Sequence, residues 1–428
     1  MGIIIKNGHV ISPKNGIDGQ FDIRIADGRI AQIAENIIPN GEKIIDASGK
    51  IVAPGLVDIH THLREPGFEY KEDIETGTRS AARGGITSIA CMPNTNPATD
   101  SAEIIDYINR RAGEVGCVHV YPIGAITKGL KGEEMTDFKA LKEAGAVAVS
   151  DDGRPVMNAE TMKNALIYAD SLGMPVISHC EDLNLAKNGA MNEGAVAKRM
   201  GVSEISTAAE EAMAARDIVL GYTVDAHIHI AHVSTRGSVA LVRDAKARGI
   251  KVTCETCPHY FSLTEEACER LGTMAKMNPP LRTEDDLAAI IEGLVDGTID
   301  AIVTDHAPHH ADEKAKDFEA APNGILGFET SLPLAITELY RKGRMALSDI
   351  IACMTYRPAD IIGIDKGYLA EGKDADIVIF DTNRSFTVKE DEIVSKAKNT
   401  PYIGATLYGA PEYTIVSGKI VLENGKIN

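Results

Sequence analysis

The stretch IVAPGLVDIHTHLREPG, residues 51–67, places two histidines two positions apart at the end of an apolar run. Side chains of a β-strand alternate between its faces, so His60 and His62 should project from the same face of a strand over 51–60 and bind one metal ion. The pair of histidines does not explain Arg64, which follows at once. The stretch therefore predicts a strand that ends in a metal site with an additional cation.

Seven further runs of similar apolar character follow at intervals along the chain. They are residues 86–93, 118–126, 146–152, 174–180, 227–234, 251–257 and 300–306. Segments of helix-forming composition, such as 158–173 and 203–221, separate them. This alternation predicts an α/β protein built on a parallel (β/α)8 TIM barrel over residues 53–368.

The two ends of the chain have a different sequence pattern from the middle. Both contain short runs of alternating polarity, with turn signals at Asn7–Gly8, Asp27–Gly28 and Asn424–Gly425. Neither end is long enough to bury a core alone. We therefore expect residues 1–52 and 369–428 to pair into one small discontinuous β-sandwich beside the barrel.

Composition narrows the class of protein. The chain has 428 residues and a formal net charge of −18, which argues against nucleic acid or an anionic membrane as a partner. No apolar run approaches the roughly 20 residues that span a bilayer, and the first residues lack the features of a signal peptide. Seven scattered cysteines do not suggest a disulfide framework, and Cys254 and Cys257 are interpreted as packing residues. A cytoplasmic enzyme acting on a small molecule is expected.

Polar residues close most of the predicted strands, where barrel enzymes carry their chemistry. In strand order these residues are His60 and His62, Asn94, Asp151 and Asp152, His179, His232, and Asp305. Imidazole and carboxylate without thiolate suit zinc. One ion, or two ions that share a bridging carboxylate, would fit this set.

Each candidate also has a purely structural interpretation. His179 alone is compatible with a hydrogen-bonded core histidine, and Asp305 with a helix cap. In HIHIAH, the two-residue period predicts that His232 shares a face with Ile230, whereas His227 and His229 point the other way and pack. Recurrence of such residues at five strand ends favours the metal site.

Several motifs resemble one enzyme family. PGLVDIHTHLREPG, MPNTNP, SDDG, SHCED, AHVST and TDHAPH resemble the metal-dependent amidohydrolase superfamily and, within it, the bacterial type I dihydroorotases, over nearly the whole chain. The resemblance implies metal ligands at His60, His62, His179 and His232, a bridging ligand at Asp152, and a ligand and catalytic acid/base at Asp305. Many relatives carry a carboxylated lysine as the bridge. Here SDDG stands in its place, and the sequence leaves Asp151 and Asp152 open.

The resemblance also implies the reaction: reversible closure of N-carbamoyl-L-aspartate to (S)-dihydroorotate and water, in pyrimidine biosynthesis. Arg64 is then placed to hold the substrate carboxylate with its planar fork of donors, from the same strand face as His62. The remaining implied substrate contacts are Asn94, Asn278, His309, Asn323 and Gly324. The polar stretch 309–324 is expected to form a mobile loop over the site.

Two other functions compete with this hypothesis. A hydantoinase or allantoinase would share the HxH pair but usually lacks the arginine, and an inactive scaffold of the same fold would have lost ligands. For Arg64 itself the alternative is a surface ion pair with Glu65 or Glu69. A homodimer is expected, with possible association with a carbamoyltransferase.

Overall fold

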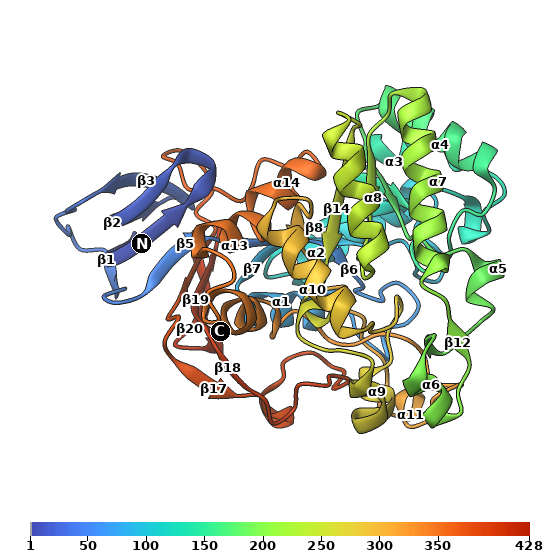
Figure 1. The fold of residues 1–428 in the computed structure, drawn as a ribbon. Coiled ribbons are helices and arrows are strands. Elements are labelled where there is room, and N and C mark those ends of the chain that lie inside the picture. The colour runs from blue at the N-terminus through green and yellow to red at the C-terminus, as the bar shows by residue number, and fades with distance from the viewer. Residues whose placement is uncertain (1) are drawn as a thin grey trace.

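The computed structural model describes residues 2–428 as a barrel joined to a smaller β-rich lobe. Figure 1 shows the strands from the two ends of the chain, in blue and red, side by side next to the barrel. Within the described residues, no helix has the length and apolar character needed to cross a membrane.

The barrel contains the eight predicted parallel strands. In the order in which they pair, they are β6 (Leu56–Thr61), β7 (Ile86–Cys91), β8 (His119–Ala125), β9 (Ala148–Ser150), β10 (Val176–Ser178), β13 (Ile228–Ile230), β14 (Val252–Thr256) and β15 (Ala301–Ile302). Between the last and first strands, Thr304 Oγ1 donates to Asp58 at 2.6 Å and the His62 backbone N donates to His306 O at 2.9 Å. These bonds bring the two edges together, and the predicted (β/α)8 fold is confirmed.

Helices surround the barrel strands (Figure 1). They are α1 (Ile74–Arg83), α2 (Ala102–Val115), α3 (Phe138–Glu143), α4 (Ala159–Ser171), α5 (Leu183–Ala186), α6 (Ala195–Met200), α7 (Ala208–Val224), α8 (Arg236–Ala247), α9 (Glu266–Leu271), α10 (Glu284–Val295), α11 (Ala311–Lys314), α12 (Ser331–Ala335), α13 (Leu347–Cys353) and α14 (Tyr356–Ile361). Full capping boxes begin α1 and α10, among others: Asp73 and Thr283 each accept from the third helical residue, which returns a bond. Such caps satisfy backbone donors that a helix start leaves free.

The first predicted run, 51–60, is two strands rather than one. β5 (Ile51–Pro54) pairs with strands of the β lobe, and β6 begins the barrel at Leu56. The change occurs at Gly55, where a Cβ would lie 2.2 Å from the Thr87 side chain, so only glycine fits. The chain therefore leaves the lobe slightly later than the expected boundary at residue 52.

The β lobe is one nine-stranded sheet built from both chain ends. Its strands are β1 (Ile3–Ser12), β2 (Ile17–Ala26), β3 (Arg29–Ala34), β4 (Lys43–Asp46), β5, β16 (Ile377–Phe380), β19 (Pro411–Val416), β20 (Lys419–Glu423) and β21 (Lys426–Ile427). Ile5, Ile23, Ile377 and Ile415 contribute to its own buried cluster. The two ends thus share one core, which neither could form alone.

Two of the three predicted turns are observed. Asp27–Gly28 connects β2 to β3 and Asn424–Gly425 connects β20 to β21, each with both residues at positive φ. The prediction for Asn7–Gly8 was wrong, because β1 continues through it with a register shift between Ile5 and Gly8. Asn7 has φ 60° there, so the pair forms a β-bulge; a bulge and a turn need the same backbone conformation.

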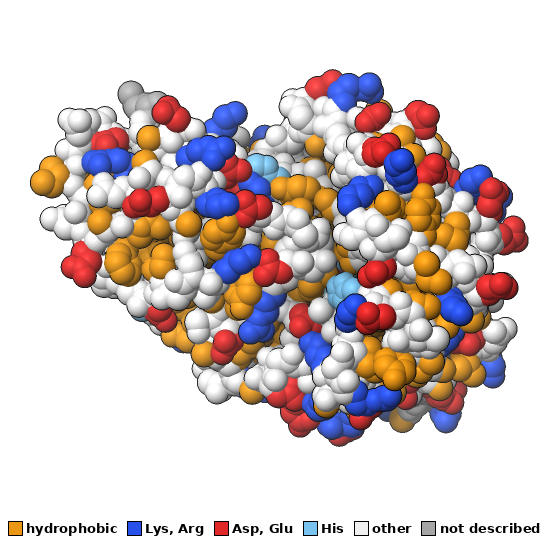
Figure 2. Space-filling model, turned by 90° about the horizontal axis from the view of Figure 1, so that it is seen from above, with side chains coloured by type: hydrophobic (Ala, Val, Ile, Leu, Met, Phe, Trp, Pro, Cys, Tyr) orange, Lys and Arg blue, Asp and Glu red, His pale blue; other side chains and the backbone are white. Residues whose placement is uncertain are grey.

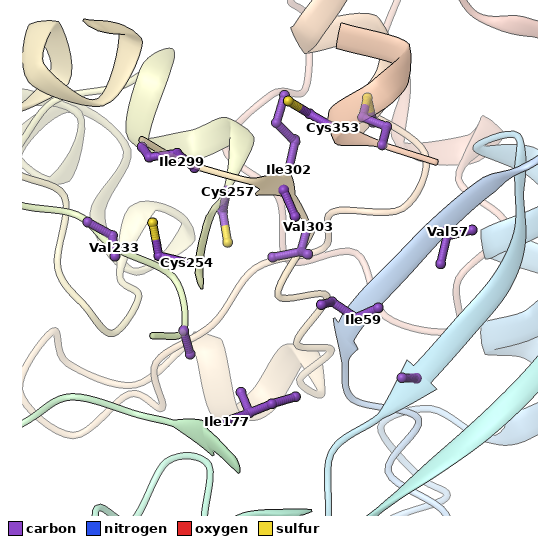
Figure 3. Packing of buried hydrophobic residues seen from close by; sticks show 14 of the residues in the cluster. Val57, Ile59, Ile177, Val233, Cys254, Cys257, Ile299, Ile302, Val303 and Cys353 are labelled. Atoms are coloured by element: carbon purple, nitrogen blue, oxygen red, sulfur yellow. The ribbon is translucent and has the colours of Figure 1, made fainter. Parts of the chain in front are cut away.

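Barrel strands and their helices share one large buried cluster (Figure 3). Cys254 and Cys257 lie in it with no exposed surface, and burial raises the pKa of both thiols. The Cys254 Sγ donates to Thr298 O at 3.4 Å. Both cysteines are packing residues, as interpreted from the sequence. On the face in Figure 2, acidic and basic side chains are interspersed over both lobes.

Part of the C-terminal region returns to the barrel. The hairpin β17 (Ser385–Thr387) and β18 (Thr406–Tyr408) stands apart from the nine-stranded sheet, and the segment 393–400 between its strands packs on the barrel. Val388, Tyr402 and Leu407 belong to the barrel cluster. Two further short strands, β11 (Met191–Asn192) and β12 (Glu204–Ile205), pair beside α6.

Candidate metal centre and active site

A pocket of about 200 Å³ opens where the barrel strands end. It is lined by His62, Arg64, Asn94, Asp152, Gly153, His179, His232, Asn278, Asp305, Ala307, His309, Asn323 and Gly324. His60 lies in contact with this set and is fully buried. Every site residue predicted from the sequence is therefore at this pocket or in contact with it.

The Asp152 carboxylate lies among four imidazoles. Its Oδ1 is 3.3 Å from His60 Nε2, 3.6 Å from His179 Nδ1 and 3.5 Å from His232 Nε2. Its Oδ2 is 3.5 Å from His62 Nε2. One carboxylate thus lies within 3.6 Å of all four histidines.

Asp305 is the second carboxylate of the centre. Its Oδ1 is 2.9 Å from His62 Nε2 and 3.7 Å from His60 Nε2. The residue has φ 47°, in the left-handed region, because the chain turns sharply there after β15. This turn directs the carboxylate to the centre.

The neighbouring Asp151 faces away from the centre. Its Oδ1 accepts from the Thr127 backbone N at 3.0 Å, and its other oxygen accepts from the Thr127 hydroxyl. Burial raises the pKa of Asp151 to about 6 despite these bonds. The geometry therefore favours Asp152 as the residue that the sequence could not distinguish from Asp151.

Hydrogen bonds set the tautomers of the HxH pair. His60 Nδ1 lies 2.5 Å from Glu255 Oε1, and His62 Nδ1 lies 2.8 Å from Asn94 Oδ1. Both oxygens accept, so each Nδ1 carries the proton and each Nε2 presents a lone pair to the centre. Asn94 also donates from Nδ2 to Asp152 Oδ2 at 3.4 Å.

His232 reaches the centre by a route that the two-residue period did not predict. Ile228 faces α7, 3.1 Å from where a Gly221 Cβ would stand, so its face points out of the barrel. β13 ends at Ile230, and His232 turns inward with φ 32°. The prediction that His232 shares the face of Ile230 was wrong, because the strand ends before that residue.

His229 does more than pack. Its Nε2 lies 3.0 Å from Glu255 Oε2, so Glu255 bonds to His229 and His60 at once. Burial opposes ionisation, but the hydrogen bonds from His229 and His60 lower the pKa of Glu255 to about 2. His227 bonds only toward Thr253, at 2.8 Å. Sequence reasoning missed Glu255, whose one signal is an acidic residue inside an apolar strand.

The donor set fits a divalent cation. Within residues 2–428, His60 Nε2 and Asp152 Oδ1 face the centre without a hydrogen-bond partner, and His179 Nδ1 and His232 Nε2 face each other at 2.8 Å beside that carboxylate. Buried polar atoms are normally paired, and clustered exceptions indicate a missing ion. Four imidazoles and two carboxylates without thiolate match the ligand preference of zinc.

Arg64 lies in the loop after β6, with φ 64°. Its Nε donates to Pro308 O at 3.2 Å, and its guanidinium lines the pocket. The alternative ion pairs are not formed: Glu65 bonds to Arg111 at 3.1 Å, and Glu69 accepts from the Gly67 backbone. Because β6 ends at Thr61, Arg64 reaches the pocket by this loop and not by the strand face expected from its spacing.

His309 and Asn278 line the pocket beside these groups. His309 Nε2 donates to Asn323 O at 2.8 Å, and its Nδ1 accepts from Lys71 Nζ at 3.3 Å. Burial and the charges of Arg64 and Lys71 lower the pKa of His309 to about 2, so the ring is neutral. Asn278 Nδ2 donates to both oxygens of Glu181 at 3.2 Å. Glu181 Oε2 lies 3.5 Å from His179 Nε2 and was also missed in the sequence.

The loop 309–324, expected to be mobile, is anchored by two buried lysines. Lys276 Nζ donates to Phe318 O at 2.6 Å and Ala321 O at 2.8 Å. Lys314 Nζ donates to Pro322 O at 3.0 Å and Gly324 O at 3.1 Å. Lys314 belongs to the polar stretch that indicated mobility, whereas Lys276 reaches the loop from outside it.

One prediction concerns Glu255. Glu255 accepts one hydrogen bond from His60 and one from His229, each on its own oxygen. A glutamine side chain has only one acceptor oxygen. Glu255→Gln should therefore weaken metal binding roughly 10- to 100-fold. Metal titration of the apoprotein measures this. Asp217→Asn is the control, a fully buried carboxylate whose partners are Ser178 and Arg216. Equal metal affinity in the two variants would contradict the role of Glu255.

A parallel barrel with these histidines and carboxylates at its strand ends is typical of metal-dependent amidohydrolases. The family described as Dihydro-orotase-like matches residues 49–238, and the Amidohydrolase family matches residues 271–422. A dihydroorotase of Acetivibrio thermocellus is 56% identical over 98% of this chain and 99% of its own. One of Ruminiclostridium cellulolyticum is 53% identical over 99% of both chains. The chain belongs to the dihydroorotase family of metal-dependent cyclic amidohydrolases.

Solved structures share the fold. An L-hydantoinase (dihydropyrimidinase) from Arthrobacter aurescens is 28% identical with a TM-score of 0.90, covering 100% of this chain and 97% of its own. A D-hydantoinase from Thermus sp. is 26% identical with a TM-score of 0.85, covering 100% and 96%. The solved hydantoinases thus share the architecture of this chain, but they are less identical to it in sequence than the dihydroorotases are.

Proposed function

We propose that the pocket at the barrel mouth catalyses the reversible closure of N-carbamoyl-L-aspartate to (S)-dihydroorotate and water. The observation that carries this proposal is Arg64, whose guanidinium lines the pocket beside the metal-binding residues while neighbouring acids bond elsewhere. A substrate carboxylate would accept hydrogen bonds from the N–H groups of this guanidinium. Dihydroorotate carries such a carboxylate on a cyclic amide.

His60, His62, His179 and His232 would hold zinc together with Asp305, and Asp152 would bridge two ions. The position of the Asp152 carboxylate among all four histidines supports its role as the shared ligand. When bound, zinc lowers the pKa of water to about 7 and polarises a carbonyl oxygen. Metal analysis per chain tests the stoichiometry.

Asp305 would act as the acid/base. In ring opening it takes a proton from the attacking water and returns it to the departing ring nitrogen. In ring closure it takes the proton from the carbamoyl nitrogen and delivers it to the departing oxygen. Its Oδ1 lies 2.9 Å from His62 Nε2, so the carboxylate stands at the centre where the proton is exchanged.

Arg64 would bind the substrate carboxylate, with Asn94 and His309 as neighbours. The Asn94 oxygen is engaged by His62, which leaves its amide N–H groups as donors. His309 is neutral, and its Nε2 donates to Asn323 O. The ring therefore shapes the pocket wall and adds no charge to it. Asn278, Asn323 and Gly324 would contact the ring, since they line the same pocket.

Two competing functions are less supported. A hydantoin ring has no carboxylate to pair with Arg64, and an inactive scaffold would not keep the complete donor set. The curated relatives at 56% and 53% identity are dihydroorotases, whereas the hydantoinases are below 30%.

The test is Arg64→Met, with Arg64→Lys as the milder change. A point charge replaces a planar fork in Arg64→Lys, and no charge remains in Arg64→Met. Charge-assisted hydrogen bonds contribute roughly 1.5–3 kcal/mol, so kcat/KM for dihydroorotate should fall on the order of tenfold to a few hundredfold. Steady-state ultraviolet assays measure this, and zinc content should stay unchanged.

The control substrate is 5,6-dihydrouracil, the same ring without the carboxylate. Arg64→Met should erase the preference for dihydroorotate over this ring. A wild-type protein that processes both rings equally well, or a mutant that loses the same factor for both, would identify a general cyclic amidase instead.

The domain division, the homodimer, the carbamoyltransferase association and the cytoplasmic location stay predictions. Size-exclusion chromatography with light scattering tests the homodimer.

A further inference from the structure

Asn399 belongs to the C-terminal segment that returns to the barrel, and it is 2% exposed. Its side chain bonds to three backbone groups. Nδ2 donates to Ala307 O and Gly324 O, both at 3.0 Å, and Oδ1 accepts from the His309 backbone N at 3.1 Å. Its own backbone O accepts from Leu326 N at 2.9 Å.

These bonds join two loops where their direct pairing ends. Ala307 N donates to Ile325 O at 2.8 Å, the last bond between the segment after β15 and the segment 324–326. Within residues 2–428, no further backbone–backbone bond joins the two loops on the pocket side. The Asn399 amide fills this gap and supplies both donors and an acceptor, as an added strand would.

The Pro308–His309 peptide group is held at both of its ends. Pro308 O accepts from Arg64 Nε at 3.2 Å, and the His309 N–H of the same peptide donates to Asn399 Oδ1 at 3.1 Å. A peptide group is planar, so fixing its N–H also fixes the direction of its carbonyl. Asn399 is thereby connected to Arg64 through one rigid group.

We infer that Asn399 is a positioning residue for recognition of the substrate carboxylate. It orients the peptide that holds Arg64, and it fixes the backbone of His309 and Gly324 at the pocket wall. The inference rests on the proposed role of Arg64. The residue comes from outside the barrel, so the C-terminal segment contributes to specificity and not only to the stability of the fold.

The test compares Asn399→Ala and Asn399→Asp with Thr414→Val. Thr414 is fully buried and its hydroxyl donates to Ala82 O at 2.8 Å, so Thr414→Val also removes a bond between the C-terminal region and the barrel. For each variant, kcat and KM are measured with dihydroorotate and with 5,6-dihydrouracil. Zinc content and the thermal midpoint are measured alongside.

Asn399→Ala should raise KM for dihydroorotate on the order of tenfold, because a shift of Arg64 by about 1 Å is costly for a bound ligand. Its kcat should change by less than about threefold, and KM for dihydrouracil should rise clearly less than KM for dihydroorotate, because only Gly324 among the fixed groups contacts the shared ring. Asn399→Asp should raise KM further, because it places a carboxylate against two carbonyls. Thr414→Val should lower the thermal midpoint and leave both KM values at the wild-type level.

An unchanged KM in both Asn399 variants, or an equal rise for both substrates, would overturn the inference. Arg64→Met, measured in parallel, separates this failure from that of the proposed function. If Arg64→Met loses the preference for the carboxylate and the Asn399 variants keep it, only the role of Asn399 is wrong. If Arg64→Met keeps the preference, the proposed carboxylate site itself is wrong.

Discussion

Asp305→Asn should lower kcat for dihydroorotate by roughly 10²–10⁴-fold, the usual contribution of a positioned acid/base. An amide has the same shape and still offers an oxygen to the centre, but it cannot accept and return a proton. The variant should therefore retain at least one zinc ion. Ultraviolet assays in both reaction directions, with metal analysis of the same samples, measure the two effects.

The control for this change is Asp151→Asn. Asp151 is a buried carboxylate adjacent to the centre, but its oxygens accept from Thr127. This variant should lose stability and keep most of its turnover. Near-normal turnover in Asp305→Asn would remove Asp305 from the acid/base role, whereas loss of all metal would make it a ligand first.

His60→Ala and His179→Ala should each lose zinc and activity together. Each side chain is nearly or fully buried and directs a nitrogen at Asp152, so its removal leaves a coordination position open. Activity should fall by at least about three orders of magnitude, because water is no longer activated. Inductively coupled plasma spectrometry and the ultraviolet assay give the two values.

His227→Ala is the matched control for these histidine variants. His227 lies on the same strand run as His232 but bonds toward Thr253. Its loss should leave zinc content and turnover near the wild-type level. Full activity with unchanged zinc in His60→Ala or His179→Ala would contradict the metal-site assignment.

Local patterns were enough to predict the barrel. Eight apolar runs separated by helix-forming segments correspond to the eight observed strands, since strand and helix periods appear in any short window. Polar residues at the ends of those runs converge because parallel strands end at one rim. His60, His179, Asp305 and the pair Asp151–Asp152 therefore follow from position at a strand end, without knowledge of any contact.

Predictions that depended on the precise end of an element were less successful. The period placed His232 on the face of Ile230, but β13 had already ended. Asn7–Gly8 has the composition of a turn and is a bulge, because positive φ serves both. Gly55 divides one apolar run between two sheets, since its packing partner Thr87 comes from another strand.

Long-range contacts decided the rest. Asp151 and Asp152 are equivalent in sequence, and only Thr127, 24 residues away, separates them by binding one. Glu255 lies 195 residues from His60, and Asn399 lies 90 residues from His309. A hydrogen bond of this kind leaves no signal in the local periodicity or composition of the sequence. Its two partners meet only when the barrel closes and the C-terminal segment folds back onto it. The chain alone thus indicates which strand ends carry the metal site, and folding selects the residues that orient it.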